Sequence, residues 1–149
     1  MKKLSLLLST FLLLSFVGCS SPSLSGKKVK KEYFTGGQIR TEFIMDGDTE
    51  QNGLLKKYGY NGNVTSTVTI KNGVKNGTET WYDQKHRPVR RVPYINGRIH
   101  GTFTDLYANG EILATIEFKN GIRNGIARSF SKDGSVYRQV MYRNGKIIN

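Results

Sequence analysis

Asn72-Gly73, Asn96-Gly97, Asn120-Gly121 and Asn144-Gly145 are four copies of one dipeptide, and successive copies lie 24 residues apart. A further glycine follows each of the first three copies four residues later, at Gly77, Gly101 and Gly125. A fixed period of this kind is typical of a repeat architecture. Asn-Gly accommodates positive φ at both central positions of a turn and joins antiparallel strands tightly. The spacing therefore predicts a series of β-hairpins, with the second glycine of each unit at a bend or bulge where backbones approach closely.

The segments between these turns alternate apolar and polar residues with a period of two, as strands do. A longer strand carries the apolar positions Val64, Val68 and Ile70 in the first full copy, Val92 and Tyr94 in the second, Ile112, Ile116 and Phe118 in the third, and Val136, Val140 and Tyr142 in the fourth. A shorter strand carries the apolar column Tyr58, Tyr82, Leu106 and Phe130. We expect one face of each strand to be buried and the other, which holds residues such as Thr67 and Thr69, to be wet.

A weaker copy precedes the four regular ones. Tyr33, Gly37, Ile39, Phe43 and Met45 match the first full copy at an offset of 25, and Gly53 matches Gly77 at an offset of 24. One extra residue therefore lies within residues 46–52. An irregular end copy is what a capping repeat looks like, so we count about five units of 24 residues, the last of them truncated.

The pattern of an aromatic residue, Asn-Gly and a second glycine resembles the MORN-repeat variant common in bacterial proteins, over residues 33–149. The resemblance implies an all-β fold: an elongated, curled antiparallel meander of β-hairpins. A flat sheet would leave its apolar face wet, so we expect that face to close on itself or to be covered by a partner. In the second full copy His86 replaces the turn glycine, and Pro88 and Pro93 enter the long strand. We expect the middle of the array to be kinked or partly unpaired there.

The N-terminus, residues 1–18, reads as a secretory signal. Lys2 and Lys3 precede 14 mostly apolar residues, Leu4 to Val17, which is shorter than the roughly 20 residues of a membrane span. Gly18-Cys19 then resembles the bacterial lipobox, in which the cysteine is lipidated and becomes the new N-terminus. Cys19 is the one cysteine of the chain, which excludes an internal disulfide. We expect acyl chains on Cys19 to anchor the protein in a membrane.

Residues 19–32 read as a flexible basic linker that carries Lys27, Lys28, Lys30 and Lys31. These lysines would either lie on anionic headgroups or form a solvated spacer. The chain has a net charge of +12. Such an excess favours anionic partners or serves solubility.

Motifs for chemistry are scarce in this sequence. We see no phosphate loop, no nucleophile with a matching base and no metal-ligand spacing, so we expect no enzymatic activity, no cofactor and no metal. The densest polar feature is a basic cluster in the irregular repeat, with Trp81 as a candidate outer contact beside a buried Tyr82. The cluster comprises Lys85, His86, Arg87, Arg90, Arg91 and Arg98. It would be an anion or partner site, or else a solvated loop.

These observations favour a lipid-anchored protein of the bacterial cell envelope, on the outer membrane of a Gram-negative or the surface of a Gram-positive cell. Its repeats would be a non-catalytic scaffold that binds a protein, anionic lipid or acidic glycan, with no nucleic acid expected. The resemblance also implies an alternative, because some relatives carry an antitoxin label: a protein that binds and neutralises a partner. Recovery from membranes with Cys19 acylated would favour the first hypothesis, and cytosolic recovery with Cys19 unmodified the second.

Overall fold

The Asn-Gly dipeptides form tight turns between antiparallel strands. A computed structural model describes residues 26–148; the signal segment, Cys19 and the first part of the linker lie outside this range. The four asparagines of the turns have φ between 49° and 52°, and the glycines that follow them have φ between 76° and 86°. Both central positions are left-handed, as the predicted hairpin turns require.

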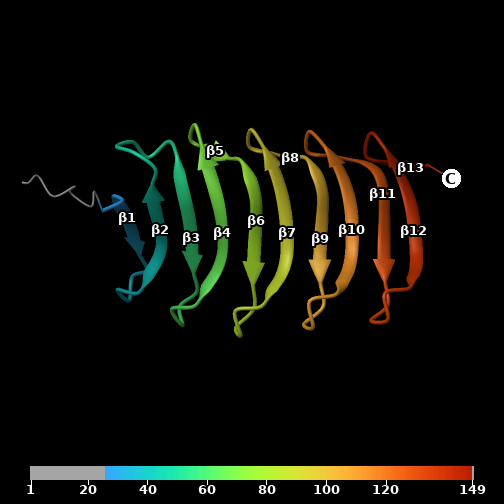
Figure 1. The fold of residues 1–149 in the computed structure, drawn as a ribbon, viewed down its shortest axis with the longest axis horizontal. Coiled ribbons are helices and arrows are strands. Elements are labelled where there is room, and N and C mark those ends of the chain that lie inside the picture. The colour runs from blue at the N-terminus through green and yellow to red at the C-terminus, as the bar shows by residue number, and fades with distance from the viewer. Residues whose placement is uncertain (1–25, 149) are drawn as a thin grey trace, which may run out of the picture.

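Thirteen strands form one antiparallel sheet in the described part of the chain. They are β1 (Val29–Tyr33), β2 (Ile39–Met45), β3 (Gly53–Tyr58), β4 (Val64–Lys71), β5 (Val74–Lys75), β6 (Gly77–Tyr82), β7 (Pro88–Ile95), β8 (Arg98–Ile99), β9 (Gly101–Leu106), β10 (Ile112–Lys119), β11 (Ile122–Phe130), β12 (Val136–Arg143) and β13 (Lys146–Ile148). Neighbours in sequence are neighbours in the sheet, except that β5 pairs only with β4 and β8 only with β7. The order confirms the elongated hairpin meander (Figure 1).

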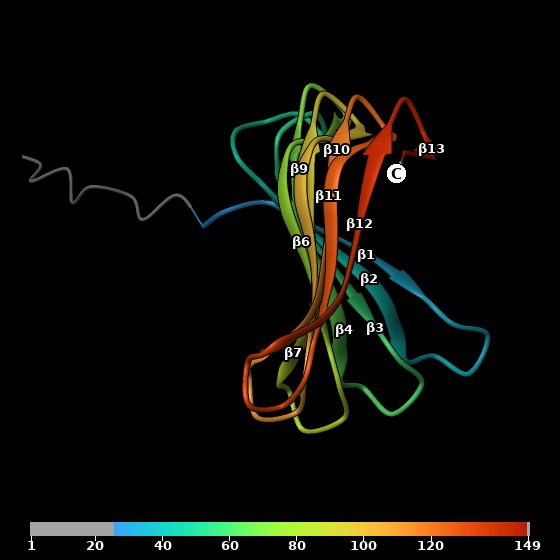
Figure 2. The same cartoon turned by 90° about the vertical axis from the view of Figure 1, so that its right-hand side faces the viewer.

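The sheet is a single open layer. Figure 2, which looks along the array, shows strands fanned out by twist and no second layer over residues 26–148. Only Val68, Val92 and Leu106 are buried apolar residues in this range. The sheet therefore twists, but within the described residues its apolar face does not close on itself, so the first of the two expected solutions is wrong.

The second glycine of each unit forms the predicted bend. Gly77, Gly101 and Gly125 have φ of 116°, 104° and 118°. Residues other than glycine rarely adopt such values, because their Cβ atom clashes with the backbone. Gly77 and Gly101 stand where the short strands β5 and β8 give way to β6 and β9. These glycines also lie opposite large side chains, since Gly77 pairs with Tyr94, Gly101 with Phe118 and Gly125 with Tyr142. A Cβ atom at these three positions would instead meet the preceding strand, at Thr69, Pro93 and Glu117 respectively.

The proline-containing strand stays in the sheet, and the kink or partial unpairing expected in the second full copy is not found between β6 and β7. β7 pairs with β6 from Pro88 to Tyr94. Its ladder with β9 is short, with pairs at Arg90 and Arg91. The ladder between β4 and β6 is equally short although no proline is present there. The shortening follows from the glycine bends, and His86 replaces the turn glycine by adopting φ of 58° itself.

The sheet also begins earlier than the boundary at residue 33. Residues 29–32 belong to β1, which pairs with β2 from Val29↔Ile44 to Tyr33↔Ile39. The lysines expected on headgroups or in a solvated spacer instead contact carboxylates of the loop after β2 and of β2 itself. The pairs are Lys27–Asp46, Lys28–Asp48, Lys30–Glu50 and Lys31–Glu42. This corner is thus close to neutral, and residues 29–32 are strand rather than linker.

Candidate functional site

The four Asn-Gly turns form one edge of the sheet, which we call the Asn-Gly rim: residues 71–75, 95–99, 119–123 and 143–147. They lie along the upper edge in Figure 1. The turns are tied to one another, because the amide of each turn glycine donates a hydrogen bond to a carbonyl 22 residues earlier. The bonds are Gly73 N to Gln51 O, Gly97 N to Lys75 O, Gly121 N to Ile99 O and Gly145 N to Arg123 O, all of 2.7–2.9 Å. The rim is therefore a regular row of turns at fixed spacing.

The Asn-Gly rim is strongly basic. Its twenty residues contain no acidic side chain and seven basic ones: Lys71, Lys75, Arg98, Lys119, Arg123, Arg143 and Lys146. Within the described chain only Lys75 among them pairs with a carboxylate, that of Glu79, at 2.6 Å. Six cations are thus available to an external anion.

Each rim turn also exposes one aliphatic side chain. Val74, Ile95, Ile122 and Ile147 are 41%, 50%, 51% and 56% exposed. Each turn of the rim therefore combines at least one cation with one exposed aliphatic group. A surface of this composition suits the boundary between headgroups and acyl chains of an anionic bilayer.

The opposite rim, which holds the turns at residues 59–63, 83–87, 107–111 and 131–135, has a different charge. It carries three basic side chains, Lys85, Arg87 and Lys132, and three acidic ones, Asp83, Glu111 and Asp133. Arg87 pairs with Asp83 at 2.7 Å. The backbone amide and the guanidinium of Arg87 lower the pKa of Asp83. The two rims thus differ by seven formal charges, +7 against 0.

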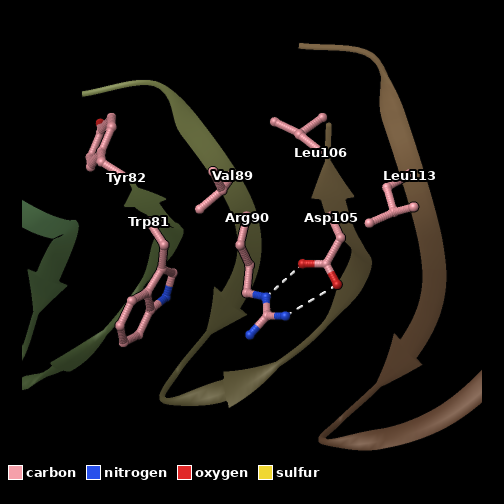
Figure 3. A pocket seen from close by; sticks show the side chains of 7 residues that line it. All are labelled: Trp81, Tyr82, Val89, Arg90, Asp105, Leu106 and Leu113. Carbon is pink, nitrogen blue, oxygen red and sulfur yellow. Dashed lines mark hydrogen bonds and ion pairs between the residues drawn. The ribbon is translucent and has the colours of Figure 1, made fainter. Parts of the chain in front are cut away.

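A hollow of about 380 Å³ opens on one face of the sheet near the opposite rim. Seven side chains of β6, β7, β9 and β10 line it: Trp81, Tyr82, Val89, Arg90, Asp105, Leu106 and Leu113 (Figure 3). Trp81, Arg90 and Asp105 are register partners on three adjacent strands, so their side chains share a face. The register of β7 against β6 shifts between Trp81 and Tyr82, which leaves Val89 as an extra residue on β7, and this bulge brings Val89 to the hollow beside Arg90.

The Arg90 guanidinium and the Asp105 carboxylate form a two-pronged ion pair in this hollow. Arg90 Nε donates to Asp105 Oδ1 at 2.6 Å, and a terminal guanidinium nitrogen of Arg90 donates to Asp105 Oδ2 at 3.1 Å. The guanidinium carbon lies 5.1 Å from the centre of the Phe103 ring. The pair is therefore held in place from two sides, beside a Trp81 indole that is 38% exposed.

The structure spreads the predicted basic cluster over several surfaces. Lys85, His86 and Arg87 lie in the turn between β6 and β7. Arg90 is in the hollow, and Arg91, the next residue of the strand, points to the other face. Arg98 is on the Asn-Gly rim at the far end of β7. Trp81 and Arg90 do lie together, but the seven candidate residues do not form one patch.

Two residues of interest, Asp105 and Glu79, are not predicted by the sequence pattern. Asp105 lies 15 residues from Arg90, and only the strand register brings the two together. Glu79 is 1% exposed. Its signal is visible in the repeat, because the same position holds Leu55, Phe103 and Ala127 in the other copies.

Neither histidine has a cluster of ligands around it. His100 Nδ1 lies 3.1 Å from Asn120 Oδ1. Among residues 26–148, no three side chains of the His, Cys, Asp and Glu types gather as a metal site would require. In the same residues no helix is long and apolar enough to cross a membrane.

Comparison with known proteins identifies the repeat. Residues 99–120 and 123–147 match the MORN repeat variant, so these two segments are similar to MORN-type repeats. No curated protein matches the sequence. One similar solved structure is a mutant of TarM from S. aureus in complex with Fondaparinux, alpha-GlcNAc-glycerol and UDP, at 11% identity and a TM-score of 0.46. That similarity covers 70% of this chain and 20% of TarM, so the chain spans about a fifth of that protein.

Proposed function

We propose that this MORN-repeat protein is a non-catalytic binding module of the bacterial cell envelope, anchored through Cys19 and resting with its Asn-Gly rim on an anionic membrane surface. The rim is the observation that supports this proposal. Six cations without a carboxylate partner and four exposed aliphatic side chains line one edge of the described sheet. Each basic residue near an anionic surface contributes about 1 kcal/mol of attraction. Both faces of the sheet would then stand away from the membrane, open to a protein or glycan partner.

The direction of the first strand agrees with this orientation. β1 is antiparallel to β2. The backbone amide of Met45, the last residue of β2, donates a hydrogen bond to the carbonyl of Lys28, just before β1. The chain therefore enters the sheet at the end of β2 that lies on the Asn-Gly side (Figure 1). Six residues lie between Cys19 and Gly26, and the seven Cα-to-Cα steps give a reach of at most about 25 Å. A lipid on Cys19 would thus hold this rim, rather than the opposite one, close to the bilayer.

The anchor is tested by acylation in a bacterial host. We expect the protein to incorporate a labelled palmitate analogue and to sediment with membranes, because several acyl chains give stable anchoring. Cys19→Ser should lose the label and no longer sediment with membranes in high salt, which screens the attraction of the rim, whereas Ser20→Ala should keep both the label and the salt-resistant sedimentation. Recovery of the native chain from the cytosol with Cys19 unmodified would contradict the anchor and favour the antitoxin-like alternative.

The orientation is tested separately with a chain that begins at Ser20 and therefore carries no lipid. We expect it to bind vesicles of phosphatidylglycerol and phosphatidylcholine. Changing Arg98, Lys119 and Lys146 together to glutamine should weaken binding about 100-fold, because three charges contribute about 3 kcal/mol. Co-sedimentation at low ionic strength measures the loss, and salt should reduce the difference.

A variant of equal charge controls for net charge alone. Lys57, Lys85 and Lys132 lie away from the Asn-Gly rim and form no ion pair within the described chain. Changing these three to glutamine should leave vesicle binding within about threefold of the native value, since their charges would not face the bilayer. Equal losses in the two triple variants would show that net charge, and not the rim, determines binding.

A further inference from the structure

We propose that the hollow beside Trp81 binds a neutral pyranose unit of a glycan. The hollow combines an exposed indole, a fixed pair of planar polar groups and an apolar floor within one space of about 380 Å³. That is the size and make-up of a small-ligand site: mostly apolar, with a few placed hydrogen-bonding groups. It is separate from the Asn-Gly rim, at the other end of the same strands.

Trp81 supplies a flat aromatic ring on which a pyranose can stack; we call this ring the platform. The electron-rich face of an aromatic ring attracts the slightly positive C–H groups that line one face of a pyranose. Trp81 is the one tryptophan of the chain. The same repeat position holds Lys57, Asp105 and Ser129. The platform therefore belongs to this one junction between repeats and is not a property of the repeat itself.

The Arg90–Asp105 pair supplies both kinds of hydrogen-bonding partner. A guanidinium has five N–H donors, and a carboxylate has about four acceptor sites on its two oxygens. The pair uses two donors and two acceptor sites internally, so the remainder can meet a ligand. A sugar hydroxyl both donates and accepts, and two neighbouring hydroxyls can therefore engage the carboxylate and the guanidinium together. Fixed side chains of this kind do not have to be ordered when the ligand binds.

The charge of the hollow favours a neutral ligand over an anion. The Arg90 guanidinium and the Asp105 carboxylate cancel, and the other five lining residues are uncharged. A proline-rich peptide would stack on Trp81, but proline residues have no backbone N–H, so they would offer Asp105 no hydrogen-bond donor. A neutral saccharide satisfies both members of the pair. That its source is a glycan of the cell envelope rests on the proposed function.

The sole tryptophan makes binding directly visible. We expect the indole fluorescence of the full chain, in a detergent without a sugar headgroup, to change on titration with one or more of chitotriose, maltotriose and cellotriose, with a Kd of about 1 mM or tighter. Asp105→Asn and Arg90→Gln should each weaken binding about tenfold. Tyr137→Ala removes an aromatic side chain that is 66% exposed outside the hollow, and it should leave the Kd unchanged.

The Trp81→Ala variant is followed by calorimetry, since it has no indole. We expect its affinity to fall more than tenfold, with circular dichroism unchanged; if that variant fails to fold, Trp81→Phe should fold and bind at least threefold more weakly than the native chain. The proposal is overturned if none of the three sugars binds at about ten times the expected Kd. It is also overturned if only a sulfated trisaccharide or a proline-rich peptide binds. Vesicle binding by the Asn-Gly rim should be unaffected in every hollow variant, so failure of the two proposals can be told apart.

Discussion

Gly53→Ala is expected to destabilise the sheet by about 3 kcal/mol, because there is no room for a methyl group at this position. Gly53 is buried at the start of β3. A Cβ atom there would collide with the backbone carbonyl oxygen of Ile44 and touch the Phe43 ring at 3.0 Å. The obstacle is main chain rather than the end of a flexible side chain. Relief therefore requires the strands themselves to move apart.

Both neighbours of β3 oppose such a movement. Gly53 pairs with Met45 on one side and with Ile70 on the other. Shifting the strand away from Ile44 would disturb two ladders at once. Urea denaturation followed by circular dichroism measures the effect as a lower midpoint with an unchanged slope. Gly59→Ala is the matched control, because its Cβ would meet only the side chains of Asn61 and Thr65, and it should cost less than about 1 kcal/mol. A loss at Gly53 as small as that at Gly59 would show that β2 and β3 separate easily.

The period of the Asn-Gly turns predicts much of this architecture. The hairpins, the glycine bends and the irregular first unit all follow from it. The position of the extra residue agrees as well, since residues 46–52 form the longer loop between β2 and β3. Alternation with a period of two says which side chains share a face, but it does not say whether that face meets a second layer. The sequence pattern therefore could not predict whether the sheet closes, and only the structure shows that it is a single open layer.

The hollow beside Trp81 shows a different limit. Trp81 was identifiable as an unusual exposed aromatic, and Arg90 as part of a basic run. Their meeting with Asp105 depends on a register shift in β7 at Val89. Because one residue of slip moves every side chain to the other face, the composition of a basic run does not indicate which of its members lie together. Pro88 and Pro93 likewise led to a wrong expectation, because both lie within the ladder between β6 and β7.

Breaking the Lys75–Glu79 ion pair is expected to have the largest effect of any single substitution considered. Glu79 is 1% exposed, and its Oε2 accepts from Lys75 Nζ at 2.6 Å across the Gly77 bend. Glu79 Oε1 has no hydrogen-bond partner among the described residues. Burial of the Lys75 ammonium alone would lower its pKa, but the hydrogen bond and charge of Glu79 outweigh this, and the pKa is raised. The stabilisation that comes from the raised pKa of Lys75 is therefore present below pH 10.5, the ordinary pKa of a lysine, and is lost as the pH rises beyond the raised value.

Lys75→Met should destabilise the protein by about 3–5 kcal/mol at pH 7, because it leaves a buried carboxylate without its cation. The other repeats suggest the repair. Ile99 stands at the Lys75 position of the next copy, and Leu55 stands at the Glu79 position of the preceding one. The double change Lys75→Ile and Glu79→Leu should restore the stability to the native value or exceed it, since a well-packed apolar pair avoids the desolvation of two charges. Urea midpoints of the single and double variants measure the coupling. If the double variant is as unstable as Lys75→Met, then packing around the Gly77 bend, and not the unpaired charge, accounts for the loss.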